Sequence, residues 1–216
     1  MSRVINAMWV RIIFICLVFN LAAAGVPAQA DAVRTTESII REVVEKSFPE
    51  LRGRKIEVKT FQSESDYFKA RFALINLLTG RKMRYLISVN PKVLENNAPP
   101  SGIRGIVAHE LAHVLYYATR KRFELIGLTR LMSSDFTRDF ERRADLIAIA
   151  RGYGEGLGEY RKWLYKNIPA DKIGEKKRNY FSPEEIEMIL KILKQRPAMM
   201  ERWLKNVPRG KDELSS

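Results

Sequence analysis

Both histidines of this 216-residue chain lie in one short string, His109-Glu110-Leu111-Ala112-His113. Apolar residues recur around them at three-to-four spacing, which predicts a helix. Side chains at positions i and i+4 of a helix share a face, so the two imidazoles can hold one metal ion. Glu110 lies near the same face, within reach of a water held by that ion. The string therefore predicts a helix that forms part of a metal site, and the rest of the chain must fold around it.

The third ligand of such a site has to come from elsewhere in the chain. Catalytic zinc sites usually have three protein ligands and one open position for water. No further histidine exists, and the one cysteine, Cys16, lies in the N-terminal segment. The third ligand is therefore a carboxylate, or the site is incomplete.

The predicted helix 135–151 carries the best candidates. Glu141 and Asp145 are four residues apart, so both point the same way, and two alanines on that side would let this helix approach the histidine helix closely. Glu141 is the expected third ligand of a Zn²⁺ ion. Asp145 would accept a hydrogen bond from the outer nitrogen of a ligating histidine. The competing interpretation pairs both acids with neighbouring arginines of the same helix, as an ordinary charged surface.

A His-Glu-x-x-His string followed on a later helix by Glu-x-x-Ala-Asp resembles the gluzincin metallopeptidases. The chain is most similar to the HtpX and CAAX-prenyl-protease type family and its soluble exported relatives, mainly over 82–152. The metzincin class is excluded, because Thr119 stands where its third histidine would be. This chain departs from the family in lacking multiple membrane spans and a downstream histidine or arginine motif. The resemblance implies that His109, His113 and Glu141 are zinc ligands. It also implies that Glu110 is the general base and that Asp145 is a supporting carboxylate.

The fold class expected from hydrophobic periodicity is α+β. Strands with period two are predicted near 56–58, 67–75 and 82–89, with a hairpin turn between the last two at Thr79-Gly80-Arg81. Caps are expected at Ser101, at Ser133 and, as a capping box, at Ser182. The glycine-rich run 152–158 should be a bend. The expected architecture is a zincin-like single domain: a small antiparallel or mixed sheet of about three strands, packed against the histidine helix, with additional C-terminal helices. Helices are predicted at 31–47, 101–119, 122–132, 135–151, 159–167, 183–195 and 197–206.

Residues 1–30 have the pattern of a secretory signal peptide. Arg3 and Arg11 are the only charged residues, a short apolar run follows, and Ala28-Gln29-Ala30 is typical of a cleavage site. The apolar run is short for a membrane span. We therefore expect export to the periplasm or the medium, with an uncleaved membrane anchor as the alternative. The mature metallopeptidase domain, 31–216, would contain no cysteine and no membrane span.

Charge is the second compositional signal. The formal net charge is +13, and without Arg3 and Arg11 the mature chain keeps 36 basic against 25 acidic residues, a net charge of +11. This positive charge could attract the protein to an anionic surface of the cell envelope. A basic surface that is simply solvated is the simpler and preferred interpretation. Nucleic acid is not an expected partner, because no recognised binding motif accompanies the charge.

The leading functional hypothesis is an exported zinc-dependent endopeptidase that acts on a protein or peptide substrate. The alternative is a non-catalytic zinc-binding envelope chaperone or adaptor that uses the basic surface, and a third reading is a structural protein without stoichiometric metal. A substrate would lie extended along the edge of strand 67–75 or strand 82–89. Tyr116, Tyr153 and Tyr160 could each donate a hydrogen bond to a tetrahedral oxyanion, although packing is the commoner role of such tyrosines.

Overall fold

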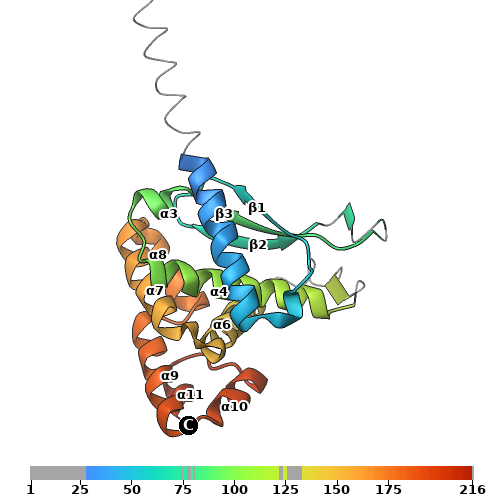
Figure 1. Cartoon of the computed structure of the whole chain (residues 1–216). Helices are drawn as coiled ribbons and strands as arrows, with labels where there is room; N and C mark the ends of the chain where they lie inside the picture. The colour runs from blue at the N-terminus through green and yellow to red at the C-terminus, as the bar shows by residue number, and fades with distance from the viewer. Residues whose placement is uncertain are drawn as a thin grey trace, which may run out of the picture.

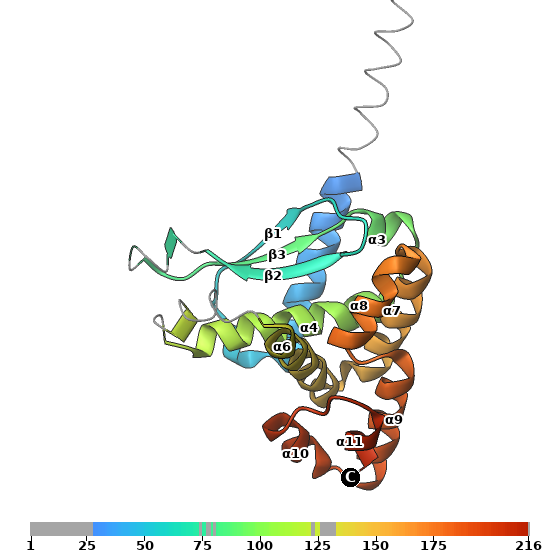
Figure 2. The same cartoon turned by 180° about the vertical axis from the view of Figure 1, so that it is seen from behind.

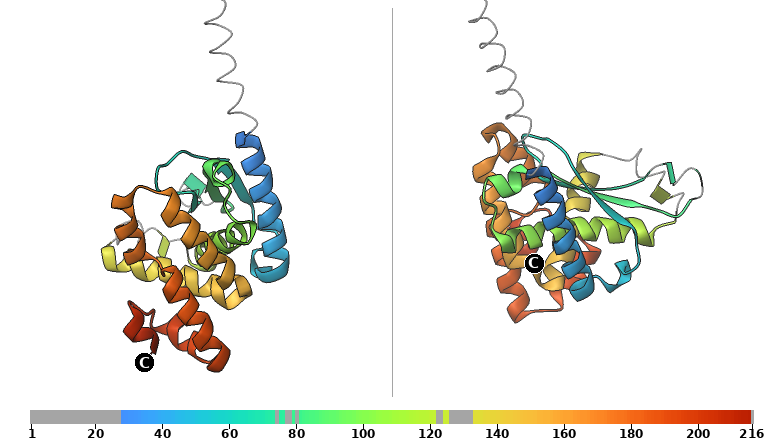
Figure 3. Two further views of the ribbon diagram at one scale, coloured as in Figure 1. Left: turned by 90° about the vertical axis from the view of Figure 1, so that its left-hand side faces the viewer. Right: turned by 45° about the horizontal axis from the view of Figure 1, so that its top comes forward.

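The computed structural model describes residues 28–73, 75–76, 79, 81–121, 124–125 and 133–215. The predicted signal peptide lies outside these residues except for its last three, and the predicted helix 122–132 lies outside them except for two helical residues. Gly80 of the predicted hairpin turn is also outside. An N-terminal helix covers 28–47, slightly longer than predicted, and Figure 3 shows it in blue along one side of the molecule. Its apolar face is buried through Ala32, Ile39, Ile40, Val43 and Val44.

The sheet is small and mixed. After the short 3-10 helix η1 (Pro49–Leu51) come β1 (Ile56–Thr60), β2 (Phe68–Phe72) and β3 (Tyr85–Val89). The strand order is β1-β3-β2: β1 pairs with β3 in parallel and β2 pairs with β3 antiparallel. Burial of alternate β3 residues, Tyr85, Ile87 and Val89, gives that central strand one core-facing side. The α+β class and the mixed three-stranded sheet are confirmed.

Helix α4 (Pro100–Thr119) carries both histidines and runs beneath the sheet (Figure 1). It follows the short helix α3 (Lys92–Glu95). Ser101 does not cap it, contrary to the prediction: Pro99 is the N-cap, and Pro100 occupies the first turn, where a missing N–H is harmless. Nearly every residue from Gly102 to Val114 is buried, because the sheet covers one side of α4 and other helices cover the rest.

The glycine-rich run 152–158 bends only at Gly152 and is helical from Gly154 onward, so the predicted bend is wrong for most of the run. Helix α6 (Ser134–Ala148) leads through a π-helical turn, η2 (Ile149–Tyr153), into helix α7 (Gly154–Asn167). The chain turns at Gly152, whose φ of 91° favours glycine. Farther along the run, Gly156 lies where α7 packs backbone to backbone on α4. A side chain at Gly156 would collide with the carbonyl oxygen of Ser101, and one at Gly105 would collide with Leu157.

The remaining helices are α8 (Ala170–Asn179), α9 (Pro183–Gln195), α10 (Met199–Lys205) and α11 (Lys211–Ser215). Helix α8 packs against α6, and α9, α10 and α11 lead to the C-terminus at the end of the molecule away from the sheet (Figure 2). The capping box at Ser182 is present as predicted, and Ser133 caps α6 as predicted. Helix α8 was not predicted, because its sequence has little apolar periodicity. None of the helices in the described part of the chain has the length and apolarity needed to cross a membrane.

Candidate metal centre

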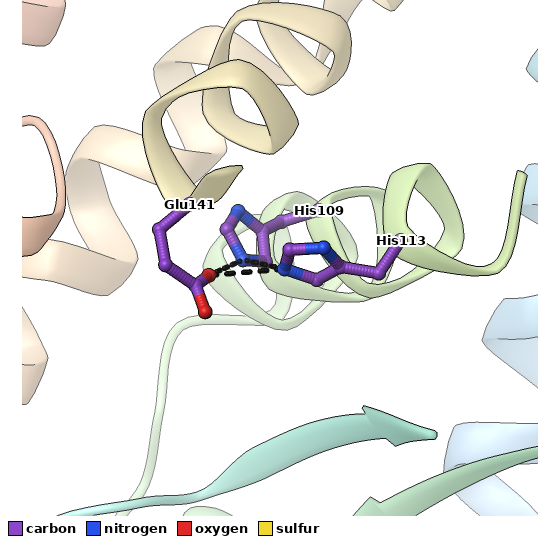
Figure 4. A group of neighbouring side chains, drawn as sticks. All are labelled: His109, His113 and Glu141. Atoms are coloured by element: carbon purple, nitrogen blue, oxygen red, sulfur yellow. Dashed lines mark hydrogen bonds and ion pairs between the residues drawn. The ribbon is translucent and has the colours of Figure 1, made fainter. Parts of the chain in front are cut away.

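His109, His113 and Glu141 converge on one point (Figure 4). The Nε2 atoms of the two histidines, on α4, are 3.1 Å apart. One carboxylate oxygen of Glu141, Oε2, comes from α6 and lies 3.1 Å from Nε2 of His109 and 3.0 Å from Nε2 of His113. Both imidazoles are buried and Glu141 is partly buried. Two nitrogens and a carboxylate oxygen in this arrangement could hold a metal ion.

A buried carboxylate orients the first histidine. Asp145 is fully buried, at 0% exposure, one turn after Glu141 on α6. Its Oδ1 accepts a hydrogen bond from Nδ1 of His109 at 2.7 Å. Because a carboxylate only accepts, Nδ1 carries a proton, and Nε2 is the nitrogen that faces the other ligands.

Asp145 has two further donors. Nη2 of Arg161, on α7, donates to Oδ1 at 3.0 Å, and the backbone N–H of Phe181 donates to Oδ2 at 3.0 Å. One carboxylate thus connects α4, α6, α7 and the segment between α8 and α9. Four elements are fixed relative to each other at the point where the histidine is oriented.

The pKa shifts of His109 and Glu141 indicate that positive charge is favoured at the point where the three ligands converge. Burial lowers the pKa of His109, but the charge of Asp145 and hydrogen bonds with Asp145 and Glu141 outweigh it and raise that pKa to about 10. Burial alone would raise the pKa of Glu141, yet the charge of His113 and hydrogen bonds from both histidines hold it well below its ordinary value. The negative charges that stabilise a proton here would also stabilise a bound cation in its place.

Glu110 faces a small cavity beside the group. Its side chain is buried, with only 4% of the residue exposed, and burial raises the pKa of its carboxyl. The cavity has a volume of about 30 Å³, and Glu110, His109, Tyr160, Arg161 and Tyr180 contribute to its lining. This is room for about one or two waters. A carboxylate with a raised pKa beside such a space is well suited to accept a proton from water.

The second histidine is held by aromatic rings. Phe140 of α6 stacks on His113 with ring centroids 4.5 Å apart, and Tyr117 stacks on it at 6.4 Å. Phe136 stacks in turn on Phe140 at 5.7 Å. No hydrogen bond to the outer nitrogen of His113 occurs within the described residues. Packing, and not a carboxylate, positions this imidazole.

The structure places the predicted site residues together and rejects the competing interpretation of their charges. Arg138 forms ion pairs with Asp135 and Asp139. Arg142 donates to Glu185 and to a backbone carbonyl. Neither arginine therefore forms an ion pair with Glu141. Asp145 pairs across elements instead of within its own helix.

The three tyrosines proposed as oxyanion donors lie in different surroundings. The hydroxyl of Tyr153 hydrogen-bonds with that of Ser47 at 3.2 Å. The guanidinium of Arg120 lies over the ring of Tyr116, 4.8 Å from its centroid. Tyr160 does line the cavity beside Glu110. Its pKa is raised by burial.

Sequence reasoning missed Arg161 and Tyr180. One signal was available for Arg161, since Leu157, Arg161 and Leu164 recur at helical spacing and put a charged residue within an apolar stripe. A charge in that position usually has a buried partner, which here is Asp145. Tyr180 had no such signal, because it follows a helix that the sequence did not predict.

Comparisons with known proteins found no match: no protein-family model, no curated protein and no solved structure is significantly similar to this chain.

Proposed function

We propose that this protein is a zinc-dependent endopeptidase of the gluzincin type. The observation that carries the proposal is the convergence of His109, His113 and Glu141 beside the buried carboxylate of Glu110. Two imidazoles and one carboxylate are a ligand set typical of catalytic zinc, which leaves a fourth position open. Separations of 3.0 to 3.1 Å between the ligand atoms are close to the roughly 3.3 Å expected around tetrahedral zinc with bonds of about 2.0 to 2.1 Å.

Each residue of the group then has a chemical role. Zinc, when bound, polarises a substrate carbonyl and makes a water more acidic. Glu110 accepts a proton from the attacking water as the water oxygen bonds to the carbonyl carbon. Glu110 later gives that proton to the leaving amine nitrogen as the C–N bond breaks. Asp145 keeps His109 in the tautomer that presents Nε2 to the ion.

The substrate would lie along β2. Of the two strands considered from sequence, β3 is central and paired on both sides, so it has no free edge. Strand β2 is at the edge of the sheet and packs directly on α4. The backbone N–H of Ala70, in the middle of β2, interacts with the carboxylate of Glu110. An extended peptide added to this edge would pass close to the general base.

Export remains part of the proposal. The signal-peptide pattern of residues 1–30 supports action in the cell envelope or outside the cell on a protein or peptide substrate. The +11 charge of the mature chain would favour anionic surroundings there.

Glu110→Gln tests the proposal most directly. It should keep one zinc per chain and lower the rate of casein or peptide cleavage by about 10²- to 10⁴-fold, the usual contribution of a general base. Glu187→Gln makes the same chemical change at an exposed position of α9 and should leave activity unchanged. Equal cleavage by the Glu110→Gln and wild-type proteins would reject the assignment.

Metal analysis tests the ligand set separately. Glu141→Ala should lose stoichiometric zinc, since only two ligands remain. If wild-type protein binds one zinc per chain but cleaves no member of a peptide library, the non-catalytic chaperone or adaptor hypothesis is favoured instead.

A further inference from the structure

Tyr180 lies next to the metal group without being part of it. It follows α8 directly, and its ring centroid is 5.9 Å from that of His109. It lines the same cavity as Glu110. Burial, together with the nearby carboxylates of Glu141 and Glu110, raises the pKa of its phenol, so the hydroxyl keeps its proton at neutral pH.

The ring of Tyr180 is fixed by the network that orients His109. The guanidinium of Arg161 lies over the ring, 4.3 Å from its centroid, and Arg161 is itself held by Asp145. The next residue, Phe181, donates its backbone N–H to the other oxygen of Asp145. Both the ring and the backbone of this segment are therefore positioned by the carboxylate that positions the histidine. A donor held in this way needs no rearrangement to act.

The hydroxyl of Tyr180 is a free donor. It forms no hydrogen bond with any residue in the described ranges, whereas its cationic neighbours are committed: Arg161 donates to Asp145 and Lys176 donates to Asp66 at 2.5 Å. Nε of Arg161 also has no partner, but that side chain is only 2% exposed and cannot meet a substrate. Tyr180 is only partly buried.

We infer that Tyr180 is a catalytic residue that donates a hydrogen bond to the carbonyl oxygen of the substrate as negative charge develops on it. This inference rests on the proposed peptidase function. The phenol keeps its proton throughout. The proton that moves is the one from the attacking water, which passes through Glu110 to the amine nitrogen when the C–N bond breaks. Tyr180 stabilises the tetrahedral state more than the planar substrate, which is the condition for raising kcat.

Tyr180→Phe is the decisive variant, because it removes one oxygen and keeps the ring on His109 and under Arg161. We expect kcat to fall by about 10²- to 10³-fold, the usual effect of losing one oxyanion donor, with little change in KM. Zinc content and Tm should match those of wild type. Tyr153→Phe, which removes a hydroxyl bonded to Ser47, is the matched control and should keep full activity.

Binding gives a readout independent of turnover. Calorimetry with a phosphinic peptide, which imitates the tetrahedral state, should show that Tyr180→Phe weakens affinity by about the same factor as kcat, since only that state uses the donor. Affinity for an uncleaved substrate peptide, measured in the Glu110→Gln background, should be unchanged.

The outcomes separate the two proposals. Cleavage by wild type with kcat of Tyr180→Phe within twofold of it would overturn the role of Tyr180 and leave the peptidase function standing. A loss of activity in Tyr117→Phe, on the His113 side, with Tyr180→Phe unaffected would overturn it in the same way. A wild-type protein that binds zinc and cleaves no peptide overturns both.

Discussion

The two histidines are four residues apart on one helix, but their surroundings are opposite in character. His109 is held by a buried polar network of Asp145, Arg161 and the N–H of Phe181. His113 is held by stacked rings, chiefly Phe140. Hydrogen bonds to charged groups are directional and expensive to leave unmade in the interior. Ring stacking tolerates small shifts at little loss.

The difference indicates which side of the site is preorganised. The network side joins four elements through directional hydrogen bonds at Asp145, so it sets the position of Nε2 of His109. The stacked rings around His113 can shift slightly to match that position. Substitutions on the network side should therefore damage the fold and the metal site together, while those on the aromatic side should affect metal affinity slightly and stability less.

Asp145→Ala should have the largest effect. It leaves the buried Arg161 guanidinium, His109 Nδ1 and the N–H of Phe181 without an acceptor, and removing one partner of a buried ion pair costs about 3 to 5 kcal/mol. Urea denaturation of the metal-free protein measures this. Glu201→Ala, which breaks the exposed pair with Lys205, should cost at most about 1 kcal/mol. Equal losses in the two variants would contradict the comparison.

Metal affinity should rise steeply with pH. His109 must lose a proton to bind a metal, and because its pKa in the metal-free protein is about 10, apparent affinity should increase by about tenfold per pH unit, or about 100-fold from pH 6.5 to 8.5. Competition with a chromophoric chelator measures the slope. A slope that becomes flat above pH 7 would show that the network does not raise this pKa.

The same proton affects the stability of the metal-free fold, with a defined sign. The folded-state pKa of His109 is about 10 and its ordinary value is 6.5. The stabilising contribution is therefore complete below pH 6.5 and is lost as the pH rises through 10. In His109→Gln this pH dependence should disappear from thermal unfolding curves.

Gly156→Ala tests how α7 presents Arg161 to the network. The new methyl would collide with the Ser101 carbonyl, a backbone atom that cannot move aside, so α7 must shift from α4 at a cost of about 1 to 3 kcal/mol. Gly174→Ala, in α8, meets nothing within 4 Å and should stabilise by about 0.5 to 1 kcal/mol. Chemical denaturation measures the free energy of unfolding of both variants. Stabilisation by Gly156→Ala would argue against the close packing of α7 on α4.

Phe140→Leu should have the smallest effect. The leucine keeps apolar volume but removes ring stacking worth about 0.5 to 1.5 kcal/mol, so metal affinity should fall by less than about tenfold and Tm should change little. Phe136→Leu is the control, because Phe136 stacks on Phe140 and makes no ring contact with His113. A larger loss of metal affinity from Phe140→Leu than from Asp145→Ala would reverse the proposed ranking of the two sides.

Local patterns predicted much of this site. The spacing of His109 and His113 requires only a helix to bring them together, and Glu141 and Asp145 share a face for the same reason. The absence of other histidines or available cysteines then pointed to Glu141. The cap at Ser133 and the capping box at Ser182 are also local, since each is formed within four residues.

Two further features depended on contacts between segments that are distant in the sequence. The run 152–158 was predicted to be a bend from its glycines, but it is helical from Gly154 onward. Gly156 packs against the backbone of α4, where a side chain would collide, and such packing overrides weak helix propensity. The choice of β2 as the free edge also depended on the order β1-β3-β2, which no segment specifies by itself.

The sequence by itself determined the chemistry that this protein can offer: which side chains can ligate a metal, which helices carry them, and which acids share a face. These follow from spacing along one helix at a time. Only the tertiary structure decided that Arg161 and Phe181 meet at Asp145 and that Tyr180 lies beside His109. Those contacts join segments far apart in the chain, and they exist because a buried charge is stable only where distant donors converge on it.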